Sequence, residues 1–253
     1  MNKLSILIVS AAFMILTTGC VGFYDTVEKD IVMVKKVSKN KISNEVKYEE
    51  VLSQDTAKTL SLNAVNKYFD TQLSRDDVQI ELMEIDQKNL KGLVEHGINQ
   101  RLSQQEREDF ETELEKTPGG LFYLTLTVSS KRNEVYNIVL NARNGDVLNI
   151  YKLNLDRNKS IDGSRFIEQI IKTANKFIQE KENYNLSDLT MDFRTILSDT
   201  AEVYYWSKNN QLKYHVIVHL EEMQVIGFNK DILAMLKYYT GLTNYQYWQD
   251  YRN

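Results

Sequence analysis

YNIVLNARNGDVLNI, at residues 136–150, is the stretch that decides the fold, because YHVIVHLEEMQVIGF at residues 214–228 repeats its pattern. The two stretches match at a constant offset of 78 residues (214 − 136), with tyrosine over tyrosine and apolar residues at alternate positions after it. Successive side chains of a β-strand point to opposite faces, so this alternation predicts a strand with one apolar face. One half-buried strand is therefore predicted to occur twice. Its apolar positions are Tyr136, Ile138, Leu140 and Ala142 in the first copy and Tyr214, Val216, Val218 and Leu220 in the second.

The opposite face of this strand carries Asn137 and Asn141 in the first copy, and His215 and His219 in the second. Asn-Gly at residues 144–145 predicts a hairpin turn, because both residue types accept a positive φ. The second copy has Glu-Glu-Met-Gln at this place, so we expect that hairpin to close differently.

Length and composition set broad limits on the protein. A chain of 253 residues forms one large domain or two small ones. The net charge of −4 gives no basic surplus that would predict a nucleic-acid partner. The only cysteine is Cys20, so no internal disulfide can form.

The N-terminus explains this cysteine. Lys3 precedes an apolar run at residues 4–16, which has the length of a signal-peptide core and is shorter than the ~20 residues of a membrane span. Together with Thr-Thr-Gly-Cys at its end, the segment resembles a bacterial lipoprotein signal, although Thr17 stands where leucine is commonest. The alternative is an ordinary secretory signal with a chance cysteine.

The resemblance implies that residues 1–19 are removed and that the thiol of Cys20 receives a diacylglyceryl group. Two acyl chains anchor a protein stably. We therefore expect a lipid-anchored protein on the extracytoplasmic face of the cell membrane, with residues 20–54 as anchor and tether. A small basic cluster in this tether is either a solvated linker or a site of attraction to anionic lipid or wall polymer: Lys35, Lys36, Lys39 and Lys41.

The rest of the chain divides into two modules of similar order. Residues 55–157 begin with a helix at residues 55–73, for which Asp55 is the expected N-cap, and continue with antiparallel strands. Residues 158–228 repeat this order, with Asp162 as the expected cap of a second helix. The sequence thus predicts an α+β fold built from two tandem helix-plus-antiparallel-sheet modules.

The helices align at an offset of 109 and the sheets at 78, which predicts an insertion of 31 residues (109 − 78) in the first module. This insertion falls within residues 87–120 and looks helical, with Ser103 and Glu106 as a capping box. Its acidic residues, from Glu106 to Glu115 and including Glu113, are expected on the outer surface, as a solvated helix face or a docking face.

The two modules resemble the PepSY superfamily, in which a helix packs on an antiparallel sheet and the last hairpin often reads like IVLNARNGDV at residues 138–147. The resemblance covers most of residues 55–228. It implies an extracytoplasmic binding or regulatory module, and it supplies no catalytic residues.

We find no sequence motif of a catalytic nucleophile, a nucleotide-binding loop or a zinc protease. His215 and His219 suggest a metal site only if they share a helix face, but on a strand four residues advance ~13 Å, too far for one ion. No metal, cofactor or enzymatic activity is therefore expected.

The C-terminal residues 229–253 are expected to form a short amphipathic helix and an aromatic tail with Tyr245, Tyr247 and Trp248. These rings either pack back on the sheet as a strap or stack on a sugar or a partner. The leading hypothesis for function is non-enzymatic binding or regulation of another envelope protein. The alternative is binding of a cell-wall polymer or small solute by the tail.

An open sheet face in the second module is the other candidate binding surface. It would present Ile217 between His215 and His219, so that binding would weaken as the pH falls toward ~6.5. The alternative is that the C-terminal helix and the strap around Trp248 already cover this face.

Substitution of the predicted lipid-acceptor residue tests the anchor. We expect Cys20→Ser to abolish incorporation of labelled fatty acid and to leave an unprocessed precursor, which electrophoresis and autoradiography detect. Unchanged labelling in this variant would contradict the lipoprotein interpretation.

Overall fold

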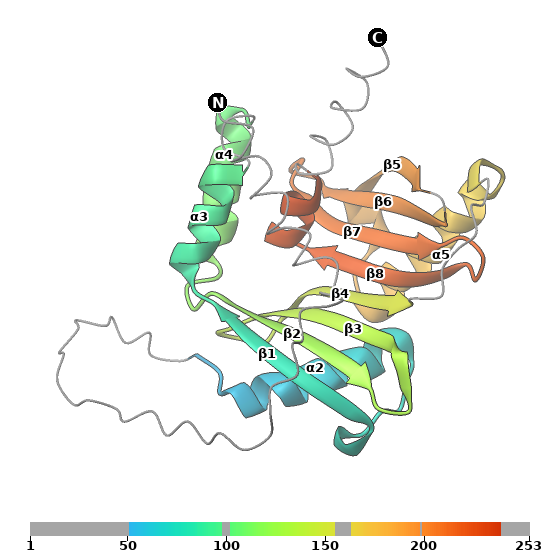
Figure 1. The fold of residues 1–253 in the computed structure, drawn as a ribbon. Helices are drawn as coiled ribbons and strands as arrows, with labels where there is room; N and C mark the ends of the chain where they lie inside the picture. The colour runs from blue at the N-terminus through green and yellow to red at the C-terminus, as the bar shows by residue number, and fades with distance from the viewer. Residues whose placement is uncertain (1–50, 98–101, 155–162, 198, 239–253) are drawn as a thin grey trace, which may run out of the picture. The chain divides into compact units, whose positions relative to one another are not determined.

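The structure, a computed structural model, describes residues 51–97, 102–154, 163–197 and 199–238 (Figure 1). These residues belong to one compact unit, Glu50–Asn253, with an α+β fold of helices and an antiparallel sheet. Among the described residues, no helix combines the length and the apolar character needed to cross a membrane. Several predicted features lie outside the described residues: the signal peptide, Cys20, the basic cluster of the tether, Asp162, Tyr245, Tyr247 and Trp248.

The first half opens with helix α2 (Gln54–Phe69). Ser53 caps this helix, because its hydroxyl oxygen accepts a hydrogen bond from the backbone N–H of Thr56 at 3.1 Å. The expected cap, Asp55, lies within the first turn instead. The other elements of this half are η1 (Arg75–Asp77), β1 (Val78–Ile85), β2 (Leu121–Val128), β3 (Lys131–Asn141) and β4 (Val147–Asn154).

The second half repeats the order of helix and strands. Its helix is α5 (Ile167–Lys181), and after the last strand residues 232–238 form a further helical segment, here called the C-terminal helix. The other elements are η2 (Gly163–Phe166), η3 (Leu186–Asp188), β5 (Leu189–Leu197), β6 (Thr200–Ser207), β7 (Leu212–His219) and β8 (Gln224–Lys230).

The segment between β1 and β2 is helical, as expected. It contains α3 (Gln87–Gly97) and α4 (Gln104–Glu115). The predicted capping box of α4 is confirmed: the Ser103 hydroxyl accepts from the N–H of Glu106 at 3.3 Å, and the Glu106 carboxylate accepts from the N–H of Ser103 at 2.7 Å.

The strands of both halves form one continuous sheet in the order β1-β2-β3-β4-β8-β7-β6-β5. From one edge inward the strands run from β1 to β4, and from the other edge inward they run from β5 to β8. Since β4 and β8 are antiparallel, the two halves are related by an approximate two-fold rotation. They meet at an antiparallel junction between β4 and β8, which in the described part of the chain has three residue pairs: Asn149 with Asn229, Ile150 with Phe228, and Tyr151 with Gly227.

The last hairpin of each half repeats in register as well as in sequence. Ile138 pairs with Ile150 in the first hairpin, and Val216 pairs with Phe228 in the second, 78 residues later in both strands. Each hairpin has a register shift at the equivalent place, Val139/Leu140 in one and Ile217/Val218 in the other. The sequence repeat is therefore also a repeat of backbone geometry.

The turns of these hairpins correct one expectation. Gly145 has φ +76°, and its N–H donates to the carbonyl of Asn141 at 2.9 Å, so the turn is longer than the two residues that Asn-Gly predicts. Met223, 78 residues after Gly145, has φ +48°. The second hairpin thus closes in the same left-handed conformation, which methionine adopts at a steric cost that glycine avoids.

The predicted apolar faces are confirmed, because the alternate residues of both repeated strands belong to one buried core. Residues of α2 and α5 belong to the same core, so both helices cover one face of the sheet, here called the inner face. Phe228 lies at its centre, with ring-centroid distances of 5.6 Å to Tyr68 of α2, 5.5 Å to Phe177 of α5 and 5.7 Å to Tyr214 of β7. The two halves therefore share a single hydrophobic core.

Deletions at equivalent inner positions test this shared core. Ile138 and Val216 are both fully buried, so we expect Ile138→Ala to cost ~2–4 kcal/mol of unfolding free energy and Val216→Ala, which removes one carbon fewer, to fall near the lower end. Chemical denaturation measures both.

The matched control is Met83→Ala on β1, where the side chain is 46% exposed and a change within ~0.5 kcal/mol is expected. A larger loss in the control than in either core variant would mean that the assignment of faces is wrong.

Candidate functional site

The outer face of the second half, opposite α2 and α5, is covered, so the hypothesis that it is an open binding surface is wrong for this structure. His215 is 0% exposed, Ile217 8% and His219 7%. The C-terminal helix lies over this face: the ring of Tyr238 meets Tyr204 and Trp206 of β6 edge-on, at centroid distances of 5.2 and 5.1 Å. His215, Ile217 and His219 are therefore internal residues in this structure rather than an exposed docking surface.

A buried polar cluster surrounds His215. Its ring stacks on Tyr204 at 4.4 Å, and its Nδ1 lies 2.9 Å from Nδ2 of Asn229. An amide NH₂ group only donates, so Nδ1 is the acceptor and the neutral ring carries its proton on Nε2. Nε2 lies 3.6 Å from the Glu202 carboxylate, beyond hydrogen-bond distance, and has no hydrogen-bond partner.

Asn229 links this cluster to the junction of the two halves. Its Oδ1 accepts a hydrogen bond from Nδ2 of Asn149 at 2.8 Å, and the same Nδ2 lies 3.3 Å from the backbone carbonyl oxygen of Phe228. Three polar side chains on β4, β8 and β7 therefore form one continuous chain, here called the Asn149–Asn229–His215 chain.

Glu202 is the acidic member of the cluster. Its carboxylate accepts from the hydroxyl of Tyr204 at 2.8 Å and lies 3.6 Å from Nζ of Lys237 on the C-terminal helix. Burial alone would raise the pKa of Glu202, but His215, Lys237 and Tyr204 outweigh this effect and hold the pKa below its usual 4.5. Burial also lowers the pKa of His215, which Glu202 opposes only in part.

His219 has separate partners at the end of β7. Its ring nitrogens lie 3.9 Å from Asp199 and 3.7 Å from Glu222. The two histidines thus contact different carboxylates, in agreement with their spacing on a strand. Within the parts of the chain that the structure describes, no three side chains of the types that usually bind metals are grouped closely enough to hold one ion.

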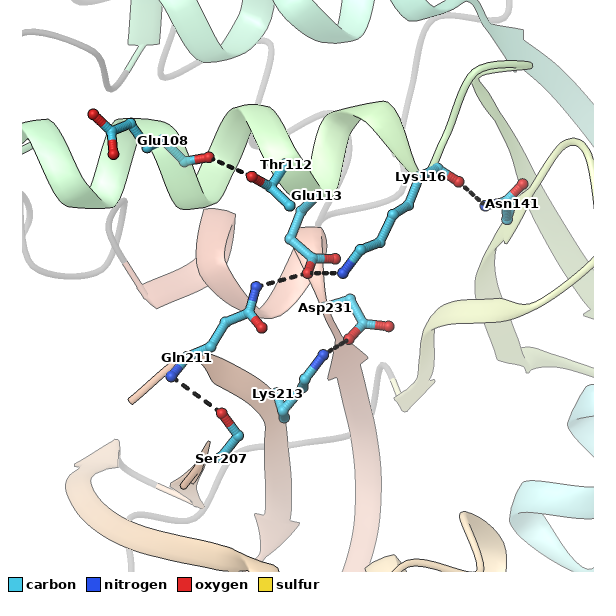
Figure 2. A network of polar contacts seen from close by, with 9 residues as sticks. All are labelled: Glu108, Thr112, Glu113, Lys116, Asn141, Ser207, Gln211, Lys213 and Asp231. Atoms are coloured by element: carbon cyan, nitrogen blue, oxygen red, sulfur yellow. Dashed lines mark hydrogen bonds and ion pairs between the residues drawn. The ribbon is translucent and has the colours of Figure 1, made fainter. Parts of the chain in front are cut away.

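A second polar network connects α4 to both halves (Figure 2). Glu113 of α4 is only 2% exposed. Its carboxylate accepts from Nζ of Lys116 at 2.5 Å and from Nε2 of Gln211, in the β6–β7 turn, at 2.7 Å. On the other side, the carbonyl oxygen of Lys116 accepts from Nδ2 of Asn141 on β3 at 3.1 Å. The inserted helix therefore has hydrogen bonds to the first and second halves alike.

The prediction that Glu113 lies on the outer surface of the insertion is wrong, because its side chain is buried. The helical spacing predicts the burial instead. Phe110 and Leu114 form the apolar side of α4, and Glu113 lies beside both on that side. The exposed acidic residues of this helix are Glu108, Glu111 and Glu115.

A small hollow of about 120 Å³ lies where β3 begins and β4 ends. Glu134 sits in it between Nζ of Lys152 at 3.4 Å and Nζ of Lys131 at 3.7 Å, and also accepts from the hydroxyl of Tyr136. The hollow is thus lined by a local ion-pair cluster in which the carboxylate is already engaged.

Comparison with known proteins shows likeness in architecture only. No protein-family model matches the chain, and no curated protein matches it in sequence. Among solved structures, the Bacillus megaterium YpeB C-terminal domain has 13% identity and a TM-score of 0.44, covering 73% of this chain and 65% of that one. The chain therefore spans less than two thirds of that structure.

Two other solved structures are similar to the chain. A protein with unknown function from Clostridium leptum DSM 753 has 12% identity and a TM-score of 0.41, covering 73% of this chain and 90% of that one. A copper-containing benzylamine oxidase from Hansenula Polymorpha has 11% identity and a TM-score of 0.21, covering 72% of this chain and 29% of that one. At these TM-scores the three likenesses carry no functional argument.

Proposed function

We propose that the protein is a lipoprotein anchored on the extracytoplasmic face of the cell membrane, whose folded body binds or regulates another envelope protein without catalysis of its own. The anchor rests on the signal-like segment before Cys20. The modules are, on this proposal, PepSY-like, which agrees with the repeated order of one helix and an antiparallel sheet in each half.

The observation that carries this proposal is the free edge of the sheet at β1. Within the described residues β1 pairs with β2 along all of Val78–Ile85 and is the first strand of the sheet order, so its other edge offers backbone groups to an added strand. Met83 on this strand is 46% exposed, and Glu81 and Glu84 are exposed beside it. An extended segment of a partner protein, with basic side chains opposite these glutamates, fits this edge.

The buried histidine and carboxylate side chains, which are the residue types most often used in catalysis, hold parts of the fold together here. His215 and Glu202 belong to the buried cluster beneath the C-terminal helix, and Glu113 holds α4 to the β6–β7 turn. These contacts favour a body that presents surfaces to a partner over one that turns over a substrate.

Binding of a wall polymer or small solute through Tyr245, Tyr247 and Trp248 is the alternative function. These residues lie outside the described part of the chain. The experiments below therefore distinguish binding through these aromatic residues from binding through β1.

Site-specific photocrosslinking in cells tests the proposal. A photoreactive residue at Met83 in the full chain is expected to capture an envelope protein, whereas the same residue at Thr59, an exposed position of α2, is not. Capture at Met83 should also require Cys20, because the anchor brings the domain to its partner.

Cell-wall sedimentation of a Tyr247→Ala, Trp248→Ala variant separates the two functions. Retained crosslinking with unchanged sedimentation supports the protein partner. Loss of sedimentation, with no protein captured at Met83, would replace the proposed function by the alternative.

A further inference from the structure

Among the described residues, the junction between the halves is the shortest ladder of the sheet. It has three residue pairs between β4 and β8, whereas β2 and β3 are joined by eight. The polar side chains of Asn149 and Asn229 lie on this ladder and form hydrogen bonds along it. Side-chain hydrogen bonds therefore supplement a short backbone ladder at this junction.

The Asn149–Asn229–His215 chain has a fixed direction. The carbonyl oxygen of Phe228 can only accept, so the side-chain group of Asn149 that faces it must be the NH₂. This NH₂ then requires Oδ1 of Asn229 as its second acceptor, which leaves the NH₂ of Asn229 facing Nδ1 of His215. A backbone carbonyl thus requires His215 to accept at Nδ1 and hence to be neutral.

The charged groups around His215 already balance one another while its ring is neutral. From β6 it faces Glu202 and Tyr204, and from β8 it faces Asn229. The C-terminal helix contributes Lys237, whose Nζ is 3.6 Å from Glu202, and Tyr238 against Tyr204. Since Glu202 is already paired with Lys237, a proton on His215 adds one net positive charge to a buried cluster.

Protonation places an N–H on Nδ1, where it meets the NH₂ of Asn229 donor to donor. If the amide of Asn229 turns to present its oxygen, its NH₂ meets the NH₂ of Asn149. If Asn149 turns as well, its oxygen faces the carbonyl oxygen of Phe228. No arrangement of these three side chains keeps all the hydrogen bonds once His215 is charged.

We propose that His215 makes the junction of the two halves sensitive to pH, so that its protonation breaks the Asn149–Asn229–His215 chain and loosens the β4–β8 ladder. The inner core of Phe228, Tyr68 and Phe177 remains, and acid therefore weakens the coupling of the halves before it unfolds them.

The sign follows from the direction of the pKa shift. Burial lowers the pKa of folded His215 below the ~6.5 of an unfolded chain. The contribution of neutral His215 is therefore fully present above pH ~6.5 and is lost progressively as the pH falls from there toward the folded pKa.

Hydrogen exchange of the full chain in detergent, between pH 7.5 and 5.0, tests this device. The readout is protection of amides in residues 149–151 and 227–229 relative to the β2–β3 ladder of the same sample, which cancels the intrinsic pH dependence of exchange. We expect this ratio to fall in the wild type as the pH is lowered, because burial lowers the pKa of folded His215.

The repeat supplies a matched variant, because Asn137 occupies the position equivalent to His215 in the first half. His215→Asn keeps an acceptor for Asn229 but cannot be protonated, so its ratio should stay constant, while His219→Asn should behave like the wild type. A constant ratio in the wild type, an equal fall in His215→Asn, or a fall abolished by His219→Asn would overturn the proposal.

Titration of the His215 ring by NMR in the wild type gives a second measurement that does not depend on a variant. In the folded protein the ring should gain its proton below pH ~6.5, at the acid end of the range in which the ratio falls, because burial lowers its pKa. A folded-state ring that gains its proton at or above pH ~6.5 would also overturn the proposal.

Discussion

The packing of Phe228 is the interaction on which the rest of the structure depends. Its ring packs against Tyr68 of α2 and Phe177 of α5, whose own rings lie 5.9 Å apart, so the three rings join both helices within the core. Its backbone pairs with Ile150 across the junction, and its carbonyl oxygen accepts a hydrogen bond from Nδ2 of Asn149. Ile150 is the residue equivalent to Phe228 in the first half (228 − 78), so equivalent positions meet at the centre of the sheet, as the approximate two-fold relation requires.

Much of this fold could be predicted from the sequence, because its signals are local. The alternation around Ile138 and Val216 and the capping box at Ser103 each depend on neighbouring residues, and the offset of 78 follows from comparing two such local patterns. The structure has all three. The joining of the halves could not be predicted in this way. The contact of β4 with β8 brings together residues about 80 positions apart, and Met223 adopts a positive φ that its residue type does not suggest.

The candidate site was predicted less well, for a physical reason. A polar face alternating with an apolar one indicates solvent only if nothing else packs on it. Here Tyr238 of the C-terminal helix covers β6, and Glu113 of the insertion reaches the β6–β7 turn, so His215 and Glu113 became internal polar groups. Internal polar groups whose hydrogen bonds have a fixed direction specify one arrangement of the surrounding elements. In this protein the Asn149–Asn229–His215 chain spans the junction of the two halves, which is the basis of the proposed pH sensitivity.

Native-state hydrogen exchange at increasing denaturant tests most directly the claim that the two halves form one cooperative body through Phe228. The shared core predicts that the most protected amides of β2–β3 and of β6–β7 open with the same free energy, and that Phe228→Leu lowers both equally. Two different opening free energies in the wild type, or a loss confined to β6–β7 in the variant, would show that the halves fold independently and would contradict this account.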